Sequence, residues 1–375
     1  MNRLLPTVLP TMLLLAPVAA ADDRYLATAE GVALAFTAEQ IAGRPASLSV
    51  DKHPGRGSLE APSREVFVYT PDDGFTGVDA LRLVEHDGPH GGGVFEVFVS
   101  VAPARIPVAG DWNGDGVTEV GRYDSGEVQL YLYQQNVPHP PRFDYTYPAA
   151  RPGWRPFAGD FDGDGFDEVG LYDPATGVFH LLRLPPNPVP PPHGVNELLP
   201  YAELAVAPSG AGEIPVAGDW SADGGDDGIG LFVPGPPAGF YLWENLDDAT
   251  PFEAAFIVLA PGTDPVAGDW DGDGRETVGL YDPATGEFHL LDDHSGGPAD
   301  EVRRVLRAAG LERLPVAGDW FDDGEPAASV GLFDPVASAT SLYEHGTLEI
   351  DSPVVVVIHT NPPCDPSAAE GCRER

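Results

Sequence analysis

The residues best suited to chemistry in this chain are acidic, and they recur in short loops rich in Asp and Gly. In residues 160–168, which read DFDGDGFDE, carboxylates occupy positions 1, 3, 5 and 9, and glycines occupy positions 4 and 6. This alternation lets a short loop wrap its oxygens around one hard cation, with the carbonyl of position 7 completing the set. Two carboxylates about 4 Å apart repel by about 4 kcal/mol at an effective dielectric near 20. The loop therefore predicts a calcium site rather than a plain turn.

Three loops carry enough oxygen ligands for calcium. The predicted ligands, in which the position-7 residues contribute carbonyls, are Asp111, Asn113, Asp115, Val117 and Glu119; Asp160, Asp162, Asp164, Phe166 and Glu168; and Asp269, Asp271, Asp273 and Arg275. A fourth loop is a weaker candidate, because Ser221 stands between Asp219 and Asp223 and the loop is one residue longer. The fifth loop has Phe321 at position 3, and we expect no metal there. An EF-hand is excluded, since position 12 is not Glu and the flanking segments read as strands.

The loops belong to five copies of one repeat. Its A-G-D phrase places an aspartate at positions 111, 160, 219, 269 and 319, and a proline-rich insertion at 185–193 lengthens the second interval. Each copy holds short strand-like segments, and D-P-A-T-G turns at 173–177 and 282–286 suit tight hairpins. Four short strands in each repeat are typical of a propeller blade. We expect an all-β fold with a five-bladed β-propeller over residues 105–360; an open β-solenoid is the alternative. Residues 299–309 fit either a helix or a fourth strand.

The A-G-D-W-x-G-D-G core resembles the FG-GAP/VCBS repeats of bacterial exported proteins, and more distantly the calcium-loop blades of integrin α propellers. The resemblance covers residues 105–360 and implies a calcium-stabilised propeller used for adhesion or ligand binding. Five units instead of seven, together with the altered fifth loop, leave the closure of the ring open.

Residues 22–103 lack the repeat and read as a small β-sandwich. Strand-like segments at 64–71, 79–85 and 94–103 are separated by Asp/Gly turns, and the last two alternate apolar and polar residues. The phrase YTPDDGFTGVDALRLVEHDG resembles bacterial cadherin-like, immunoglobulin-type modules at Tyr69, Pro71, Phe75, Gly77 and Asp79. That family implies calcium at the module ends, where Asp22, Asp23 and Asp87 are weak candidates. Residues 103–105 form the expected linker.

The two ends of the chain predict export. Residues 1–21 have an early Arg3, an apolar stretch and a small-residue end, as in a cleaved secretory signal; prolines interrupt the apolar run, which argues against a membrane span. We expect a secreted, cell-surface or periplasmic protein. In such an oxidising compartment, Cys364 and Cys372 are predicted to form a disulfide within the tail at 361–375.

The charge balance restricts the partners. With 20 Lys and Arg against 59 Asp and Glu, the formal net charge is −39. No basic footprint exists for nucleic acid or for an anionic membrane surface, so we expect binding to neither. No segment after the first 21 residues could span a bilayer, so we expect no membrane insertion. Adaptation to high salt is an alternative explanation of the charge.

We find no catalytic motif and expect a protein that is not an enzyme. His180 and His289 share one repeat position, whereas a catalytic residue is usually unique in a ring. The expected function is calcium-dependent adhesion or protein–protein interaction with an extracellular protein or glycan ligand. A lectin-like propeller is one alternative, with aromatic rings stacking on sugars, and a propeller glycoside hydrolase with paired carboxylates is a second. The aromatic candidates, which also fit a core between blades, are Tyr172, Phe179, Trp243, Tyr281 and Phe288.

Overall fold

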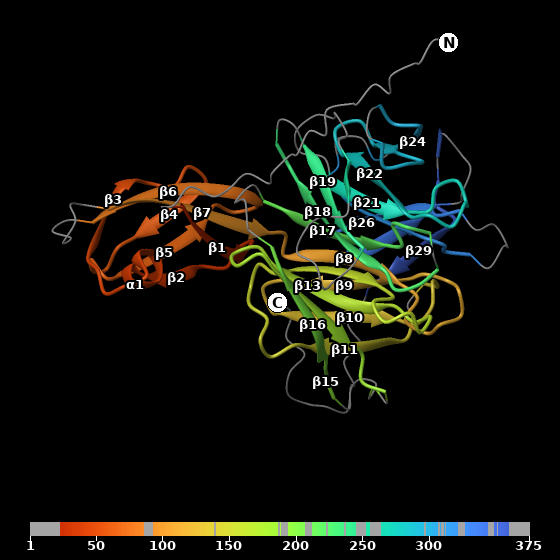
Figure 1. Ribbon diagram of the computed structural model, residues 1–375, viewed down its shortest axis with the longest axis horizontal. Coiled ribbons are helices and arrows are strands. Elements are labelled where there is room, and N and C mark those ends of the chain that lie inside the picture. The colour runs from red at the N-terminus through yellow and green to blue at the C-terminus, as the bar shows by residue number, and fades with distance from the viewer. Residues whose placement is uncertain are drawn as a thin grey trace, which may run out of the picture.

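The chain forms two β-rich parts, which lie side by side in the computed structural model (Figure 1). The structure describes residues 23–359 apart from 86–92, 139, 187, 189–193, 207–211, 223, 236–237, 245–252, 256–263, 296–297, 307, 309–310, 312, 322–326, 344–348 and 351. Several predictions lie outside the described residues: the signal at 1–21, the tail at 361–375, Asp22, Asp87, Asp223, Cys364 and Cys372. None of the described helices is long and apolar enough to cross a bilayer.

The N-terminal part is the predicted two-layer β-sandwich. One sheet has the order β1 (Asp23–Ala29), β7 (Val94–Ala102), β6 (Gly77–Glu85) and β3 (Leu48–Lys52), and the other has the order β2 (Leu34–Thr37), β5 (Val66–Pro71) and β4 (Gly57–Glu60). One short helix, α1 (Ala38–Ala42), begins with a capping box at Thr37. Every second residue of β6 is buried, which is the pattern of a strand with one face on a core. Asp79 is buried and accepts hydrogen bonds from the Gly55 and Arg56 amides, so its role is to position a loop.

The C-terminal part consists of five antiparallel blades, and its all-β character confirms the predicted fold class. The blades are numbered in chain order. Blade one contains β8 (Arg105–Gly110), β9 (Glu119–Asp124), β10 (Gln129–Tyr133) and β11 (Arg142–Thr146), and blade two contains β12 (Arg155–Gly159), β13 (Glu168–Asp173), β14 (Val178–Arg183) and β16 (Leu199–Ala205). Blade three contains β17 (Ile214–Gly218), β18 (Gly228–Val233), β19 (Gly239–Trp243) and β20 (Glu253–Ala255), blade four contains β21 (Asp264–Gly268), β22 (Thr277–Asp282), β23 (Glu287–Leu290) and β24 (Glu301–Val305), and blade five contains β25 (Leu314–Gly318), β26 (Ser329–Asp334), β27 (Ala339–Leu342) and β29 (Val355–Ile358). Two short strands, β15 (Asn196–Glu197) and β28 (Glu349–Ile350), extend the first and fourth blades. The strand reading of residues 299–309 is therefore the correct one.

The predicted hairpin turns are present between the second and third strands of blades two and four. Gly177 and Gly286 have φ of +72° and +75°, a conformation that residues with a Cβ rarely adopt. Their amides donate to the carbonyls of Asp173 and Asp282 at 2.8 Å. The D-P-A-T-G phrase thus acts as the turn that joins the two strands.

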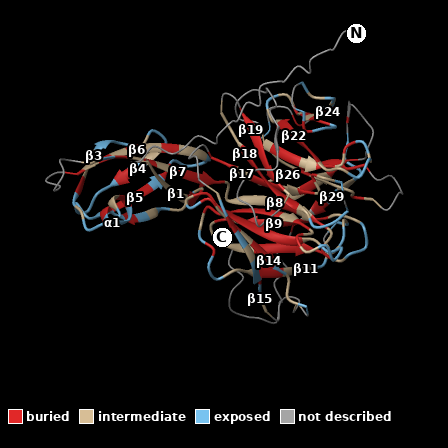
Figure 2. Cartoon of the chain, viewed as in Figure 1, coloured by how far each residue is buried: buried red, intermediate tan, exposed pale blue. Residues whose placement is uncertain are grey.

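Aromatic side chains fill the space inside and between the blades, and most strand residues of the blades are buried (Figure 2). The ring that follows each A-G-D phrase is at most 6% exposed; these rings are Trp112, Phe161, Trp220, Trp270 and Trp320. The five rings considered for sugar stacking are also buried, at most 4% exposed: Tyr172, Phe179, Trp243, Tyr281 and Phe288. They are core residues, so the interpretation of these rings as a core between blades is correct, and they are not exposed for stacking on sugars.

Blade five contacts blade one, so the five blades surround a common axis. The Thr118 amide donates to the Asp319 carbonyl at 2.6 Å, and the Asp319 amide donates back to Thr118 Oγ1 at 3.0 Å. Farther out, Arg122 Nη1 donates to Ser338 Oγ at 2.7 Å. A central cavity is lined by the first strands of all five blades. An open solenoid would leave its end units apart, and it is excluded.

Candidate functional site: the Asp/Gly loops and the blade borders

The first aspartate of each loop organises the backbone that follows it. In blade two, Asp160 Oδ1 accepts from the Asp164 amide at 3.1 Å, and Oδ2 accepts from the Gly165 amide at 2.8 Å. Gly163 and Gly165 have φ of +69° and +84°, so both glycines are needed for the chain to turn around this carboxylate. The first aspartates of other loops accept amides in the same way: Asp111 from Gly114 and Gly116, Asp219 from Gly224, and Asp269 from Gly272 and Gly274.

The aspartate at position 5 repeats a second contact. Asp164 Oδ1 accepts from the amide of Phe166, the position-7 residue, at 3.1 Å. The same bond joins Asp115 to Val117 and Asp273 to Arg275, at 3.0 and 2.9 Å. Three loops predicted to bind calcium therefore share one backbone conformation, which the sequence pattern alone had indicated.

In blades two and four the carboxylates converge. One oxygen from each of Asp160, Asp162 and Glu168 lies within 4.8 Å of the others, and the same is true of Asp269, Asp271 and Asp273. Asp162 Oδ1 is buried and has no hydrogen-bond partner, while Oδ2 is paired with Arg183. A buried carboxylate oxygen without a donor is costly unless a cation or a proton neutralises it. The donor set, all oxygen and largely anionic, matches what Ca²⁺ prefers.

Blade one has the same ligands in a looser arrangement. Asn113 Nδ2 donates to Glu119 Oε1 at 2.7 Å, and Glu119 Oε2 is buried with no hydrogen-bond partner. Burial, followed by the charges of Asp115 and Asp111, raises the pKa of Glu119 to about 8. In blade two, burial and the charge of Asp162 raise the pKa of the equivalent Glu168 to about 7. A cation bound beside either carboxylate would lower its pKa and favour the loss of its proton.

Residues at or just after the end of the third strand of a blade also reach these loops, which sequence reasoning missed. In blade two this residue is Arg183, the last residue of β14, which pairs with Asp162. In blade three it is Glu244, which follows β19 and whose Oε1 accepts from Ser221 Oγ at 2.8 Å. In blade four it is Asp292; its pKa is raised, first by burial and then by neighbouring acids that include Asp271.

These residues compensate for changes at position 9. Blades one and two have Glu119 and Glu168 at position 9, whereas the matching strand starts in blades three and four are Gly228 and Thr277. Thr277 cannot serve the loop, because its hydroxyl donates to the Leu291 carbonyl inside the blade. The acid that is missing from the second strand is supplied in each case by the end of the third strand, as Glu244 or Asp292. The sequence contains a signal for this: an acid stands at the start of the second strand in blades one and two, and after the third strand in blades three and four.

The fifth loop has an aromatic residue where the loops of blades one, two and four have a carboxylate or an amide. Phe321 occupies position 3 and its amide donates to Asp319 Oδ1 at 3.3 Å. No acidic cluster forms among the residues that the structure describes here, 322–326 being outside them.

A second set of acids links each loop to the next blade, and it too was not predicted. The Asp227 amide donates to the Asp160 carbonyl at 2.7 Å, and the Asp160 amide donates back to Asp227 Oδ2 at 2.9 Å. We call this reciprocal pair the clasp. It recurs between Asp111 and Asp167, between Asp219 and Glu276, and between Asp319 and Thr118.

The clasp explains the glycine of the A-G-D phrase. A Cβ added at Gly159 would lie 2.7 Å from Asp227 Oδ2, and one added at Gly218 would lie 2.3 Å from Glu276 Oε2. The glycine is thus required by the approach of the neighbouring blade. Burial, followed by nearby acids, raises the pKa of Asp227 to about 9 and that of Glu276 to about 8.

Only the border between blades four and five lacks the side-chain half of the clasp among the described residues. Ala328 stands where the other blades have an acid or a threonine, and it keeps the backbone bond to the Asp269 carbonyl. Arg303, 2% exposed, instead donates to the carbonyls of Ala328 and Trp270 at 2.9 and 3.3 Å.

The remaining candidates have ordinary structural roles. His180 stacks on Trp154 at 4.5 Å between ring centroids, and its Nδ1 lies 2.9 Å from Glu203 Oε1. His289 lies 3.6 Å from Glu287. Asp23, in β1, is partly buried and close enough to Tyr25 to raise its pKa, after the larger effect of burial.

Comparison with known proteins gives a match to one family model over part of the chain. A model of the FG-GAP-like repeat matches residues 111–171, which run from the first loop to the second strand of blade two. No curated protein matches the chain. The match supports the predicted FG-GAP resemblance and a propeller-type protein, an architecture compatible with protein–protein interaction.

Proposed function

We propose that this chain is an exported, non-catalytic propeller protein whose blades are stabilised by calcium and which binds an extracellular protein in adhesion or a related interaction. One observation carries the calcium part: the blade-two loop gathers Asp160, Asp162 and Glu168, and leaves a buried oxygen of Asp162 without a hydrogen-bond donor. Calcium would supply the missing positive charge. It would also release Asp162 from its pairing with Arg183.

The residues that would hold calcium follow from the loop geometry. In blades one, two and four they are the predicted carboxylates, the Asn113 amide oxygen and the position-7 carbonyls. In blade four, Asp292 joins the set, and in blade three Glu244 takes the role of the acid that is missing at Gly228. The chain's own contribution is to preorganise each loop through the amide hydrogen bonds to its first aspartate.

The interaction role rests on the architecture and on the repeat match. Propellers hold their loops on a rigid ring, and rigid loops suit recognition by a partner surface. Fold alone does not determine the partner, so its class comes from the predicted export and from the FG-GAP resemblance. Neither alternative is favoured by a specific observation, because the aromatic rings proposed for sugars are buried and the clustered acids belong to loops and clasps.

Calcium titration by isothermal calorimetry tests the metal sites. We expect saturable binding to the purified chain, and a melting temperature that rises with calcium over EDTA. At 100-fold excess over Kd, each site adds about 2.7 kcal/mol of stability. Asp162→Asn should remove one site, whereas Glu127→Gln, an exposed acid in a blade-one turn, should remove none. An unchanged melting temperature in calcium and in EDTA would refute the proposal.

The interaction role needs its own experiment. The chain would be immobilised and exposed to an extracellular protein extract in calcium, with EDTA and Asp162→Asn as the matched conditions. Captured proteins would be identified by mass spectrometry and remeasured in purified form. Calcium-dependent binding of a purified partner is the expected result. Binding of glycans on an array, or turnover of chromogenic glycosides, would instead favour one of the two alternatives.

A further inference from the structure

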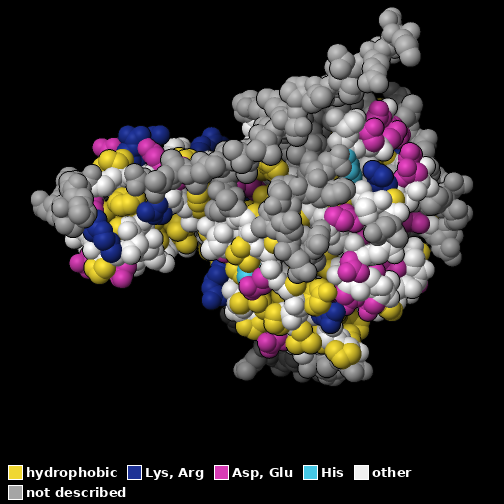
Figure 3. Space-filling view, in the orientation of Figure 1, with side chains coloured by type: hydrophobic (Ala, Val, Ile, Leu, Met, Phe, Trp, Pro, Cys, Tyr) yellow, Lys and Arg dark blue, Asp and Glu magenta, His cyan; other side chains and the backbone are white. Residues whose placement is uncertain are grey.

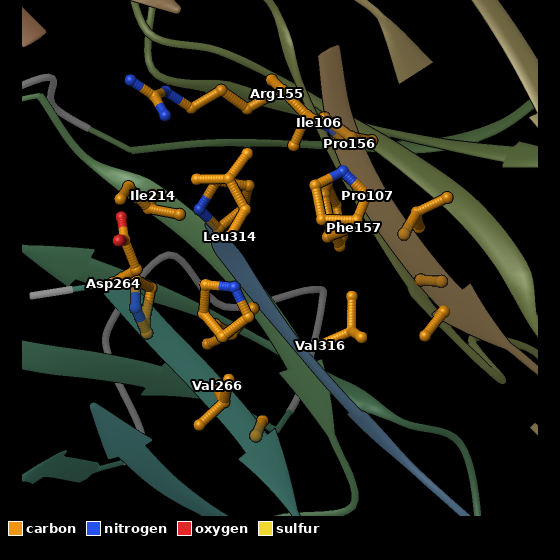
Figure 4. Close-up of a pocket in the computed structure, with 18 of the residues that line it drawn as sticks. Ile106, Pro107, Arg155, Pro156, Phe157, Ile214, Asp264, Val266, Leu314 and Val316 are labelled. Atoms are coloured by element: carbon orange, nitrogen blue, oxygen red, sulfur yellow. The ribbon is translucent and has the colours of Figure 1, made fainter. Parts of the chain in front are cut away.

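The central cavity has one polar end, which the loops and clasps do not use. The cavity measures about 170 Å³ and is lined by the first strands of all five blades. Most of its wall is aliphatic or proline, with Pro107, Pro156, Val266 and Val316 visible in Figure 4. A concave, largely apolar space with a few charged groups at its mouth is the usual form of a small-molecule site.

The polar end is formed where the first strands begin. Equivalent positions in the five blades carry Ile106, Arg155, Ile214, Asp264 and Leu314. Three are aliphatic and two have opposite charges. In Figure 4 the guanidinium of Arg155 and the carboxylate of Asp264 extend to the same side of the cavity, with Ile214 between them. The repeat therefore departs from its apolar pattern at two places that face one opening.

Neither charged group is satisfied by the described part of the chain. Arg155 is 8% exposed, its Nε has no hydrogen-bond partner, and no described acid lies within ion-pair distance of it. Burial lowers the pKa of Arg155, and the charges of Asp264 and Glu213 oppose this only in part. A buried guanidinium without partners is costly, and a carboxylate with two oxygens is its best complement.

Asp264 requires the opposite kind of partner. No described residue donates a hydrogen bond to its carboxylate, and burial raises its pKa to about 7 despite the charge of Arg155. An ammonium group would satisfy it. A simple anion or a simple cation would meet one of these two groups with the same sign of charge, whereas a zwitterion would match both.

We propose that this end of the cavity binds a free α-amino acid with a small aliphatic side chain. Its carboxylate pairs with the Arg155 guanidinium, its ammonium group pairs with Asp264, and its side chain enters the apolar cavity between the proline and valine residues. The site lies on the axis, away from the Asp/Gly loops. It is therefore independent of the proposed calcium sites.

The test is isothermal calorimetry with L-valine, in a buffer free of carboxylates and amines. Two analogues remove one charge each: 3-methylbutanoate lacks the ammonium group, and 2-methylpropan-1-amine lacks the carboxylate. We expect saturable binding of L-valine and at least tenfold weaker binding of both analogues. The absence of L-valine binding to the wild-type chain would overturn the proposal, and so would equal binding of either analogue. Measuring with calcium, and again after a chelating resin has removed the metal from the protein solution, separates this result from that of the proposed metal sites.

Variants locate the site. Arg155→Gln and Asp264→Asn should each weaken L-valine binding at least tenfold, whereas Arg304→Gln, which alters a half-exposed arginine of β24, should leave it unchanged. If Arg155→Gln fails to fold, Asp264→Asn and the cavity-filling Val266→Phe decide the question. Wild-type affinity in Asp264→Asn and Val266→Phe would overturn the proposal.

Discussion

The clasp predicts that the chain is sensitive to substitution at Gly159, which lies at the border between blades two and three and belongs to no proposed binding site. Replacing Gly159 by alanine adds one methyl group, which would lie 2.7 Å from Asp227 Oδ2 and 3.2 Å from Ala217 Cβ. Since carbon and oxygen do not approach so closely, Asp227 must move. Its hydrogen bond from the Asp160 amide, 2.9 Å long, then breaks. The substitution acts on the border between blades two and three, and not on either blade alone.

The magnitude has two parts. Leaving the Asp160 amide without an acceptor costs about 1–3 kcal/mol, and overpacking costs about 1–3 kcal/mol. We expect Gly159→Ala to lower the free energy of unfolding by about 2–6 kcal/mol. At ~2–4 °C per kcal/mol for a unit of this size, the melting temperature should fall by roughly 4–24 °C.

Urea unfolding followed by tryptophan fluorescence measures the effect, and a double-mutant cycle identifies its cause. Asp227→Ala removes the atom that the new methyl group meets, so Gly159→Ala should cost much less in that background. A coupling of about 1–3 kcal/mol is expected between the two sites. Gly126→Ala is the control, because its nearest neighbour is Val32 Cγ2 at 3.3 Å. Additive effects, or a cost below about 0.5 kcal/mol, would refute the reasoning.

Three further predictions concern buried titratable groups. The pKa of Asp264 is raised to about 7, so the folded state keeps this proton to a higher pH than the unfolded state does, and the free energy of unfolding falls as pH rises from about 4 to 7. In Asp264→Asn, the urea midpoint should depend less on pH over this range. The pKa of His359 is lowered to about 3, mainly by burial, so the free energy of unfolding falls as pH drops from about 6.5 to 3. In His359→Gln, the urea midpoint should depend less on pH over this range, whether or not the variant is less stable at neutral pH. Glu119→Gln should raise the melting temperature in EDTA above pH 8, where most of the buried carboxylate is ionised because its pKa is about 8, and should remove one calcium site by calorimetry.

The repeat pattern predicted the blades and the loop backbone because both are local. An aspartate at position 1 binds amides three to five residues ahead, as Asp111 does with Gly114 and Gly116. A D-P-A-T-G turn closes on itself in the same way. Such contacts depend only on the spacing of residue types, so reading one repeat was enough to describe the others.

The clasps, and the acids at the third-strand ends (Glu244 and Asp292), could not be predicted from a single repeat. Asp160 and Asp227 are 67 positions apart, and their contact exists only because one blade follows another around the ring. Ser221 meets Glu244 because the third strand ends beside the start of the second. Both facts require the strand register, which a single repeat does not contain. A comparison of all five repeats at the third-strand ends would have indicated the displaced acids.

The first aspartate of a loop belongs to both systems at once. The Asp160 carboxylate organises its loop, while its amide and carbonyl form the clasp with blade three. A cation held by that carboxylate would therefore also fix the backbone that joins two blades. The border between blades five and one differs, because its first aspartate, Asp319, lies in the loop where we expect no metal, and its partner is Thr118. That border should therefore respond least to calcium removal, whereas the border that joins Asp227 to the proposed metal ligand Asp160 should open first. Hydrogen exchange would show this as a larger acceleration by EDTA at the Asp227 amide than at the Thr118 amide.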